Sequence, residues 1–193
     1  TKADAFITSS EDIYLNSGEV DHVAPPAAHI MCEGLNRLFL AGIPGEPNTI
    51  WFSLLRSADQ PVNFNDALKL ILPDNGGEIT ALAIVGEALI AFKRRAIYRI
   101  RGSGPSNTLS EGTFFDAELI STDVGSTGQR SGVVCHLGAM FQSDKGFYLV
   151  EPSGAIRYMS APLEGLIGSQ APSSLINGGV LLPVDQQIRF TSA

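Results

Sequence analysis

The sequence predicts an all-β fold, a β-propeller built from units of about 50 residues. Tyr98 and Tyr148 lie 50 positions apart in matching surroundings, and Trp51 precedes Tyr98 by 47 positions. A mostly apolar segment and a tight turn precede each of these three aromatic residues. One four-stranded sheet cannot bury both of its faces alone, so a repeat of short strands indicates sheets that stack on one another.

The whole chain, residues 1–193, is predicted to be one propeller segment of about three to four blades. Its first and last units are incomplete, and propellers close with about four to eight blades. We therefore expect a partial propeller, which either belongs to a longer chain or has open edges that partners cover.

Turn-forming residues divide the first part of the chain into short strands. A turn at 16–19 predicts a hairpin, and Pro25 with Pro26 ends it. The turn at 42–48 is rich in Gly and Pro, which separates two strands and excludes a continuous helix. Residues 56–68 are expected to form a surface connection. The strands expected in this part lie within 5–15, at 20–23, twice within 29–41 around a turn at 33–36, at 50–53 and at 70–72.

Two meanders give the clearest strand pattern. The strands expected in the first are 79–85, 88–92 and 96–101, followed by an outer strand at 114–120, and those in the second are 133–137, 139–142, 146–150 and 155–159. Within 96–101, Tyr98 and Ile100 share one face and the arginines share the other, so this strand is expected to be half exposed. Residues 102–112 and 123–132 have the composition of rim loops.

The last part of the chain contains the one expected helix and one more hairpin. Ser160–Ile167 has Pro162 in its first turn and apolar residues at i, i+3 and i+4. Strands at 178–182 and 187–191 are expected to begin another unit.

Composition and charge limit the classes of protein to which this chain can belong. The chain is 44% hydrophobic and 17% charged, which is typical of a globular protein with a packed core. Thirteen basic and twenty acidic residues give a net charge of −7, which disfavours a protein that coats nucleic acid. An acidic surface that lines a channel would nevertheless let DNA pass without binding it.

The chain has few cysteines and histidines, and their spacing does not match a metal-binding site. Cys32 and Cys135 are expected to be buried thiols, with a disulfide between them left open as an alternative. His22, His29 and His136 are expected to be structural or surface residues, because none lies in a zinc-binding spacing. Neighbouring strand residues point to opposite faces, so Cys135 and His136 would not converge on one ion.

Motifs for nucleotide binding and nucleophilic catalysis are missing from the sequence. The glycines of Gly125–Gly128 are interpreted as a flexible loop and not as a nucleophile elbow. Asp116 with Glu118, and Glu11 with a neighbour, are the carboxylate pairs considered for glycoside hydrolysis, and solvated strand carboxylates are the preferred interpretation. Lys93, Arg94 and Arg95 are expected to be a solvated charge run at a hairpin tip. We therefore predict no catalytic, cofactor-binding or metal-binding residue and no enzyme activity.

Several sequence segments together resemble the propeller domain of tailed-phage tail proteins. The resemblance covers most of the chain from about residue 20 onward. The segments that carry it are 25–27, 36–42, 47–53, 77–82, 92–98, 102–105, 123–125 and 140–148. The chain is similar to the nozzle or hub proteins of short-tailed phages, although it is shorter than that family's proteins.

The resemblance implies a structural virion protein located in the phage tail. In that family a ring of subunits lies below the portal and adaptor, and it retains and conducts the packaged DNA. The implied partners are other copies of the chain, the tail adaptor and further tail proteins, with DNA passing without sequence-specific binding and with no small-molecule substrate. Two alternatives stay open: a propeller that binds carbohydrate or a receptor through Trp51, Phe114 and Phe115, and a propeller glycosidase.

Overall fold

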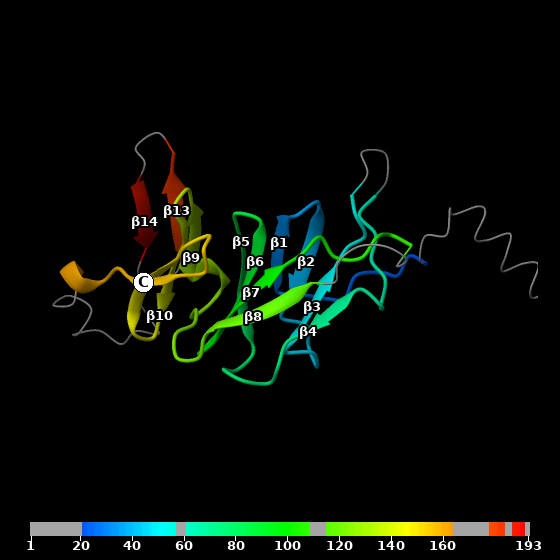
Figure 1. Cartoon of the computed structure of the whole chain (residues 1–193), viewed down its shortest axis with the longest axis horizontal. Coiled ribbons are helices and arrows are strands. Elements are labelled where there is room, and N and C mark those ends of the chain that lie inside the picture. Colours follow the sequence, from blue (N-terminus) through cyan, green and yellow to red (C-terminus); the bar gives the residue numbers. More distant parts are fainter. Residues whose placement is uncertain (1–20, 57–60, 109–114, 164–177, 184–186, 192–193) are drawn as a thin grey trace, which may run out of the picture.

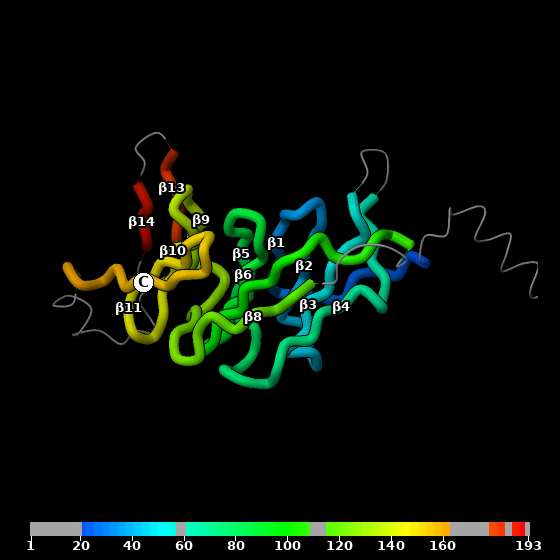
Figure 2. Tube along the Cα trace, viewed as in Figure 1, coloured from blue at the N-terminus to red at the C-terminus, as the bar shows by residue number. Residues whose placement is uncertain are grey.

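The computed structural model describes residues 21–56, 61–108, 115–163, 178–183 and 187–191. This part of the chain is all-β, with four antiparallel sheets in chain order, and the first three follow one another along the long axis of the molecule (Figure 1). Each of the first three sheets has four strands in sequential order, and the fourth is a two-stranded hairpin. The described ranges do not close into a ring, as the trace in Figure 2 also shows.

The four sheets are named by their order. The first sheet has β1 (Ile30–Gly34), β2 (Arg37–Ala41), β3 (Thr49–Phe52) and β4 (Lys69–Ile71). The second has β5 (Ile79–Val85), β6 (Ala88–Lys93), β7 (Ile97–Arg101) and β8 (Asp116–Ser121). The third has β9 (Gly132–Cys135), β10 (Gly138–Ser143), β11 (Gly146–Val150) and β12 (Ile156–Tyr158), and the fourth has β13 (Gly178–Leu182) and β14 (Gln187–Thr191). Two 3-10 turns, η1 (Gln129–Ser131) and η2 (Ala161–Leu163), lie between strands.

Strand register confirms the repeat predicted from the sequence. A two-residue turn joins the first strand to the second in each of the first three sheets. The residues paired across this turn are Gly34 with Arg37, Val85 with Ala88, and Cys135 with Gly138. Three residues further along the second strand, the pairs with the third strand are Leu40 with Trp51, Ala91 with Tyr98, and Phe141 with Tyr148. The three aromatic residues therefore occupy equivalent positions.

Successive sheets pack face to face. The first strands lie next to one another, β1 beside β5, β5 beside β9 and β9 beside β13. We call the face that a sheet turns toward the following sheet its forward face, and the opposite one its back face. One core lies between the first and second sheets, and another between the second and third. The second sheet is thus covered on both faces, which explains why every residue of β6 is buried.

The connection before β4 differs from the sequence-based expectation. Residues 56–68 were expected to lie on the surface, yet Phe64 and Leu68 are buried. Phe64 packs with Leu40 and Trp51 on the back face of the first sheet, where no preceding sheet lies among the described residues. Val23 pairs with Phe64 as an isolated bridge, and residue 20 of the expected strand 20–23 lies outside the described part, as does the strand within 5–15.

The predicted helix is wrong in its described part. Ala161–Leu163 forms only a 3-10 turn, and residues 164–167 lie outside the described ranges. The Ser160 hydroxyl, expected near the cap, instead accepts a hydrogen bond from the Phe147 N–H at 2.5 Å. The other predicted strands from residue 29 onward are confirmed, with ends that differ by a few residues.

Trp51→Ala is expected to lower the free energy of unfolding by about 3 to 5 kcal/mol. Its indole packs in the back-face cluster, donates to Glu46 Oε2 at 3.0 Å and lies under the Lys69 ammonium. Glu118→Ala is the control, because Glu118 is exposed and its ion pair with Arg101 is exposed as well, and a change within about 0.5 kcal/mol is expected. Urea unfolding of both variants checks the prediction, and equal losses would contradict it.

Candidate functional site

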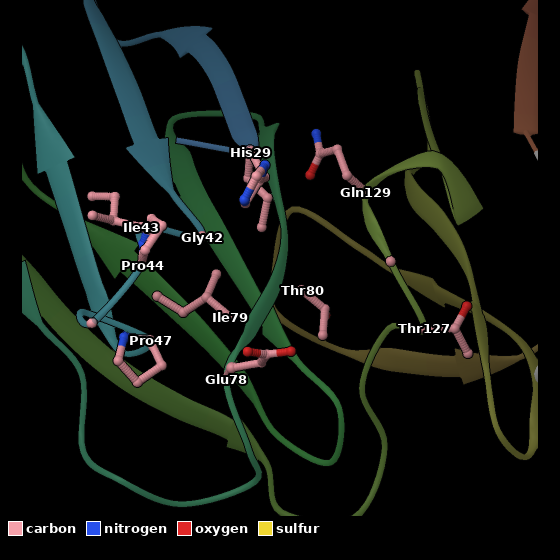
Figure 3. Close-up of a pocket in the computed structure, with 13 residues that line it drawn as sticks. His29, Gly42, Ile43, Pro44, Pro47, Glu78, Ile79, Thr80, Thr127 and Gln129 are labelled. Carbon is pink, nitrogen blue, oxygen red and sulfur yellow. The ribbon is translucent and has the colours of Figure 1, made fainter. Parts of the chain in front are cut away.

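A cleft lies where the first, second and third sheets approach one another (Figure 3). Its volume is about 730 Å³. The turn after β2, the start of β5 and the loop before η1 form its walls. His29 and Glu78 are the ionisable side chains among its lining residues, and both are exposed.

The other polar side chains of this cleft are engaged in holding the loops together. Gln129 accepts a hydrogen bond from the Leu82 N–H at 2.8 Å and donates to the Leu82 carbonyl at 3.1 Å. The Gln129 side-chain amide therefore makes the same two hydrogen bonds with the edge strand β5 that a residue of a neighbouring strand would make. Thr80 donates to the Ser126 carbonyl at 2.9 Å. These contacts join the loop before η1 to the second sheet. Few polar side chains of the cleft are therefore left to bind a ligand.

Lys93 is fully buried, so the prediction of a solvated charge run is wrong for this residue. Its ammonium donates to Asn48 Oδ1 at 2.6 Å and to the Pro73 carbonyl at 2.7 Å, both in the first sheet's connections. Burial lowers the Lys93 pKa from its ordinary value, and the Asp74 carboxylate opposes part of that shift. Lys93 therefore links the second sheet to the first.

Arg94 links the second sheet to the third. Its guanidinium donates to Asp144 through Nε at 2.8 Å and through a terminal nitrogen at 2.5 Å. Arg94 and Asp144 occupy the same turn position in successive repeats, 50 residues apart. The repeat thus places opposite charges next to each other along one rim.

A double-mutant cycle of Arg94→Ala and Asp144→Ala is expected to give a coupling free energy below about 1 kcal/mol. Both side chains are more than one third exposed, so water screens the ion pair in spite of its two-pronged geometry. Thermal unfolding of the four proteins measures the coupling. A coupling of several kcal/mol would mean that the pair is shielded from water.

Arg37 is the second fully buried cation, and it also joins two sheets. Its guanidinium donates to the Ser53 carbonyl at 2.6 Å, to the Ser103 carbonyl at 3.3 Å and to the Pro105 carbonyl. Burial lowers the pKa of Arg37 to about 10. Sequence reasoning missed Arg37, although a signal existed: it shares a strand face with Phe39 and Ala41, which are core residues.

The carboxylates considered for catalysis do not form a pocket. Asp116 and Glu118 lie on the exposed β8, and Glu118 pairs with Arg101 at 3.2 Å. This solvated position agrees with the preferred interpretation of the pair. Glu11 lies outside the described residues.

The cysteines lie on different sheets, Cys32 on β1 and Cys135 on β9, and both are free thiols. Both are half-buried, so the prediction of full burial is corrected. Burial raises the Cys32 pKa, which keeps this thiol protonated and weakly reactive. His22 and His29 are exposed, and His136 lies in the turn between β9 and β10. The described ranges hold no group of three His, Cys, Asp or Glu residues able to bind a metal.

Two of the three rim aromatics proposed for binding are packing residues. Trp51 is buried, and the Phe115 ring packs edge-on against Phe52 at 5.0 Å between centroids. Phe114 lies outside the described part. In the segment Gly125–Gly128, Gly125 lies against the Lys93 carbonyl, so close packing and not flexibility explains this glycine.

Neither a protein-family model nor a curated protein matches this sequence. In the part of the chain that the structure describes, no helix is long and apolar enough to cross a membrane.

Proposed function

We propose that this chain is part of a β-propeller in a structural virion protein, in the nozzle or hub of a phage tail. The observation that carries the proposal is the order of the sheets: each covers the next, and the first strands lie side by side from β1 to β13. Propellers repeat four-stranded sheets around a central channel, so the same order continued through further sheets would form a ring.

The proposed role is to retain and conduct packaged DNA. Copies of the protein would form a ring with the tail adaptor and other tail proteins, and their inward surface would repel the DNA phosphates. The net charge of −7 supports a surface along which DNA slides without binding. The similarity of the sequence segments to tail nozzle and hub propellers supports the location in the virion.

The use of buried polar side chains also supports a structural role. Arg37 and Lys93 donate hydrogen bonds to carbonyl and amide oxygens in neighbouring connections. Arg94 binds Asp144 of the following sheet. These groups fix sheets to one another, and we propose that the protein is not an enzyme and has no small-molecule substrate.

A receptor-binding or carbohydrate-binding propeller is the second candidate, and the cleft of Figure 3 is the observation that favours it. Aromatic platforms are absent among the cleft's described lining residues, which is a poor surface for stacking sugars. Glu78 is the one carboxylate there, whereas glycoside hydrolysis needs two. A glycan array and a hydrolysis assay test this alternative.

Immunogold labelling of intact virions tests the structural proposal. Antibodies against this chain are expected to label the tail axis below the portal, in several copies per particle. Labelling confined to peripheral fibres, together with binding on the glycan array, would replace the conduit role with receptor binding. The absence of the chain from purified virions would overturn both.

A further inference from the structure

The turn at residues 73–77, between β4 and β5, contains an exposed Asn-Gly dipeptide. Asn75 is exposed, and Gly76 follows it. Because glycine has no Cβ, the backbone nitrogen of Gly76 is open to approach by the preceding side chain. Among the described residues, the Gly76 N–H has no hydrogen-bond partner. This nitrogen is therefore available to react with the Asn75 side-chain amide.

The fold requires glycine at position 76. Gly76 has a φ of +72°, and a Cβ there would lie 2.5 Å from the Ala96 Cβ and 2.9 Å from the Ala96 nitrogen. The Arg95 N–H also donates to the Gly76 carbonyl at 2.9 Å. Gly76 therefore packs tightly on the turn after β6, and a larger residue that would hinder reaction at its nitrogen does not fit.

The Asn75 side chain is also part of the junction between the first and second sheets. The buried Tyr98, on β7, donates a hydrogen bond from its hydroxyl to Asn75 Oδ1. Two residues before Asn75, the Pro73 carbonyl accepts a hydrogen bond from the Lys93 ammonium at 2.7 Å. The residues of the turn on both sides of the dipeptide are thus held against the second sheet.

A donor at Oδ1 favours attack on the side-chain amide carbon. When the Gly76 nitrogen forms a bond to Asn75 Cγ, negative charge develops on Oδ1, and the Tyr98 hydroxyl is already placed to stabilise that charge. The bond from Cγ to Nδ2 then breaks, and the amide group leaves as ammonia with the proton of the Gly76 N–H. Water opens the resulting succinimide ring at either carbonyl, which gives aspartate or isoaspartate.

We propose that Asn75 is a site of spontaneous covalent modification, converted through a succinimide to aspartate and isoaspartate, with the Tyr98 hydroxyl as the promoting donor. Isoaspartate adds a methylene to the backbone before Gly76, and Gly76 has no room to move toward Ala96. The conversion therefore loosens the junction between the first and second sheets. The proposal depends on the geometry of the turn and not on a role in a virion.

Incubation of the full chain at neutral pH, followed by peptide mass spectrometry, measures the conversion. Asn75 is expected to convert while Asn36 and Asn107, which precede Arg37 and Thr108, do not. Labelling by an isoaspartyl methyltransferase identifies the isoaspartate product. The free peptide of residues 73–78 sets the time scale. An unchanged Asn75 in the folded chain, at a time when this peptide is fully converted, would overturn the proposal.

Two matched substitutions test the role of the Tyr98 hydroxyl. Tyr98→Phe removes the donor and keeps the ring, and it is expected to slow the conversion of Asn75 roughly tenfold. Tyr148→Phe makes the same change at the equivalent position of the third sheet and is expected to leave the rate at Asn75 unchanged. Equal rates in the two variants, or faster conversion in Tyr98→Phe, would contradict the proposal.

Circular dichroism shows whether the Tyr98→Phe protein is folded. If it is not, the wild type is compared in buffer and in urea. Unfolding separates Tyr98 from Asn75 and is expected to slow the conversion, and faster conversion in urea would overturn the role of the hydroxyl.

Hydrogen exchange of the Arg95 amide reports the loosening, because this N–H donates to the Gly76 carbonyl. Exchange of this amide is expected to be faster in converted than in fresh protein, while residues 146–150 of the third sheet keep their rates. Unchanged exchange at Arg95 in converted protein would show that the junction tolerates the modification, contrary to the proposal.

Discussion

Gly125→Ala is expected to lower the free energy of unfolding by about 3 kcal/mol or more. A Cβ at this position would lie 1.9 Å from the Lys93 carbonyl oxygen and 2.7 Å from the Arg94 carbonyl carbon. These atoms are backbone, so no side-chain rotation relieves the overlap. The Ser126 N–H also binds the Lys93 carbonyl at 3.0 Å, which holds the loop against the turn after β6.

Gly128→Ala is the control for this prediction. Gly128 lies in the same loop, has an extended backbone, and has no atom within 4 Å of where its Cβ would be. Urea unfolding is expected to leave the Gly128 variant close to wild type while the Gly125 variant unfolds at much lower urea. Similar midpoints for the two variants would show that the loop can move away from Lys93.

Arg37→Met is expected to cost about 3 kcal/mol or more, because the removed guanidinium leaves several carbonyl groups without their donor. Two of these carbonyls, Ser103 and Pro105, belong to the connection after β7, and one, Ser53, follows β3. Removal of the guanidinium is therefore expected to loosen the connection after β7 from the first sheet, and also to lower the free energy of unfolding.

Arg101→Met is the matched control, since Arg101 is exposed and its partner among the described residues is exposed Glu118. A loss below about 1 kcal/mol is expected there. Thermal unfolding compares the two variants, and hydrogen exchange of residues 102–108 reports the loosening. If exchange in this segment did not change in Arg37→Met, the guanidinium would not be what anchors it.

Strand positions were predictable because their causes are local. Alternating side chains and turn residues placed β5, β13 and β14 at their observed bounds, and the 50-residue correspondence predicted the equivalence of Tyr98 and Tyr148. The aromatic residues repeat because each fills the same place on a back face. The order of the sheets followed from the same repeat.

The environment of the charged residues was not predictable in the same way. Lys93 resembles a solvated hairpin-tip lysine in the sequence, and it is buried because Asn48 and Pro73, which are 45 and 20 residues away, accept its hydrogen bonds. Ser160 resembles a helix cap, and it binds β11 instead. The Lys93 outcome depends on contacts between two sheets, and the Ser160 outcome depends on a contact with a strand 13 residues away, so neither is contained in the local sequence pattern.

The burial of the second sheet on both faces has a consequence for how the molecule comes apart. Within the described residues, two interfaces stabilise the second sheet and one stabilises the first, so local opening of the second sheet should cost more free energy. Damage to β6 would remove support from the first and third sheets at once, because both pack on the sheet that contains it. One damaged strand in this position would therefore loosen two interfaces together.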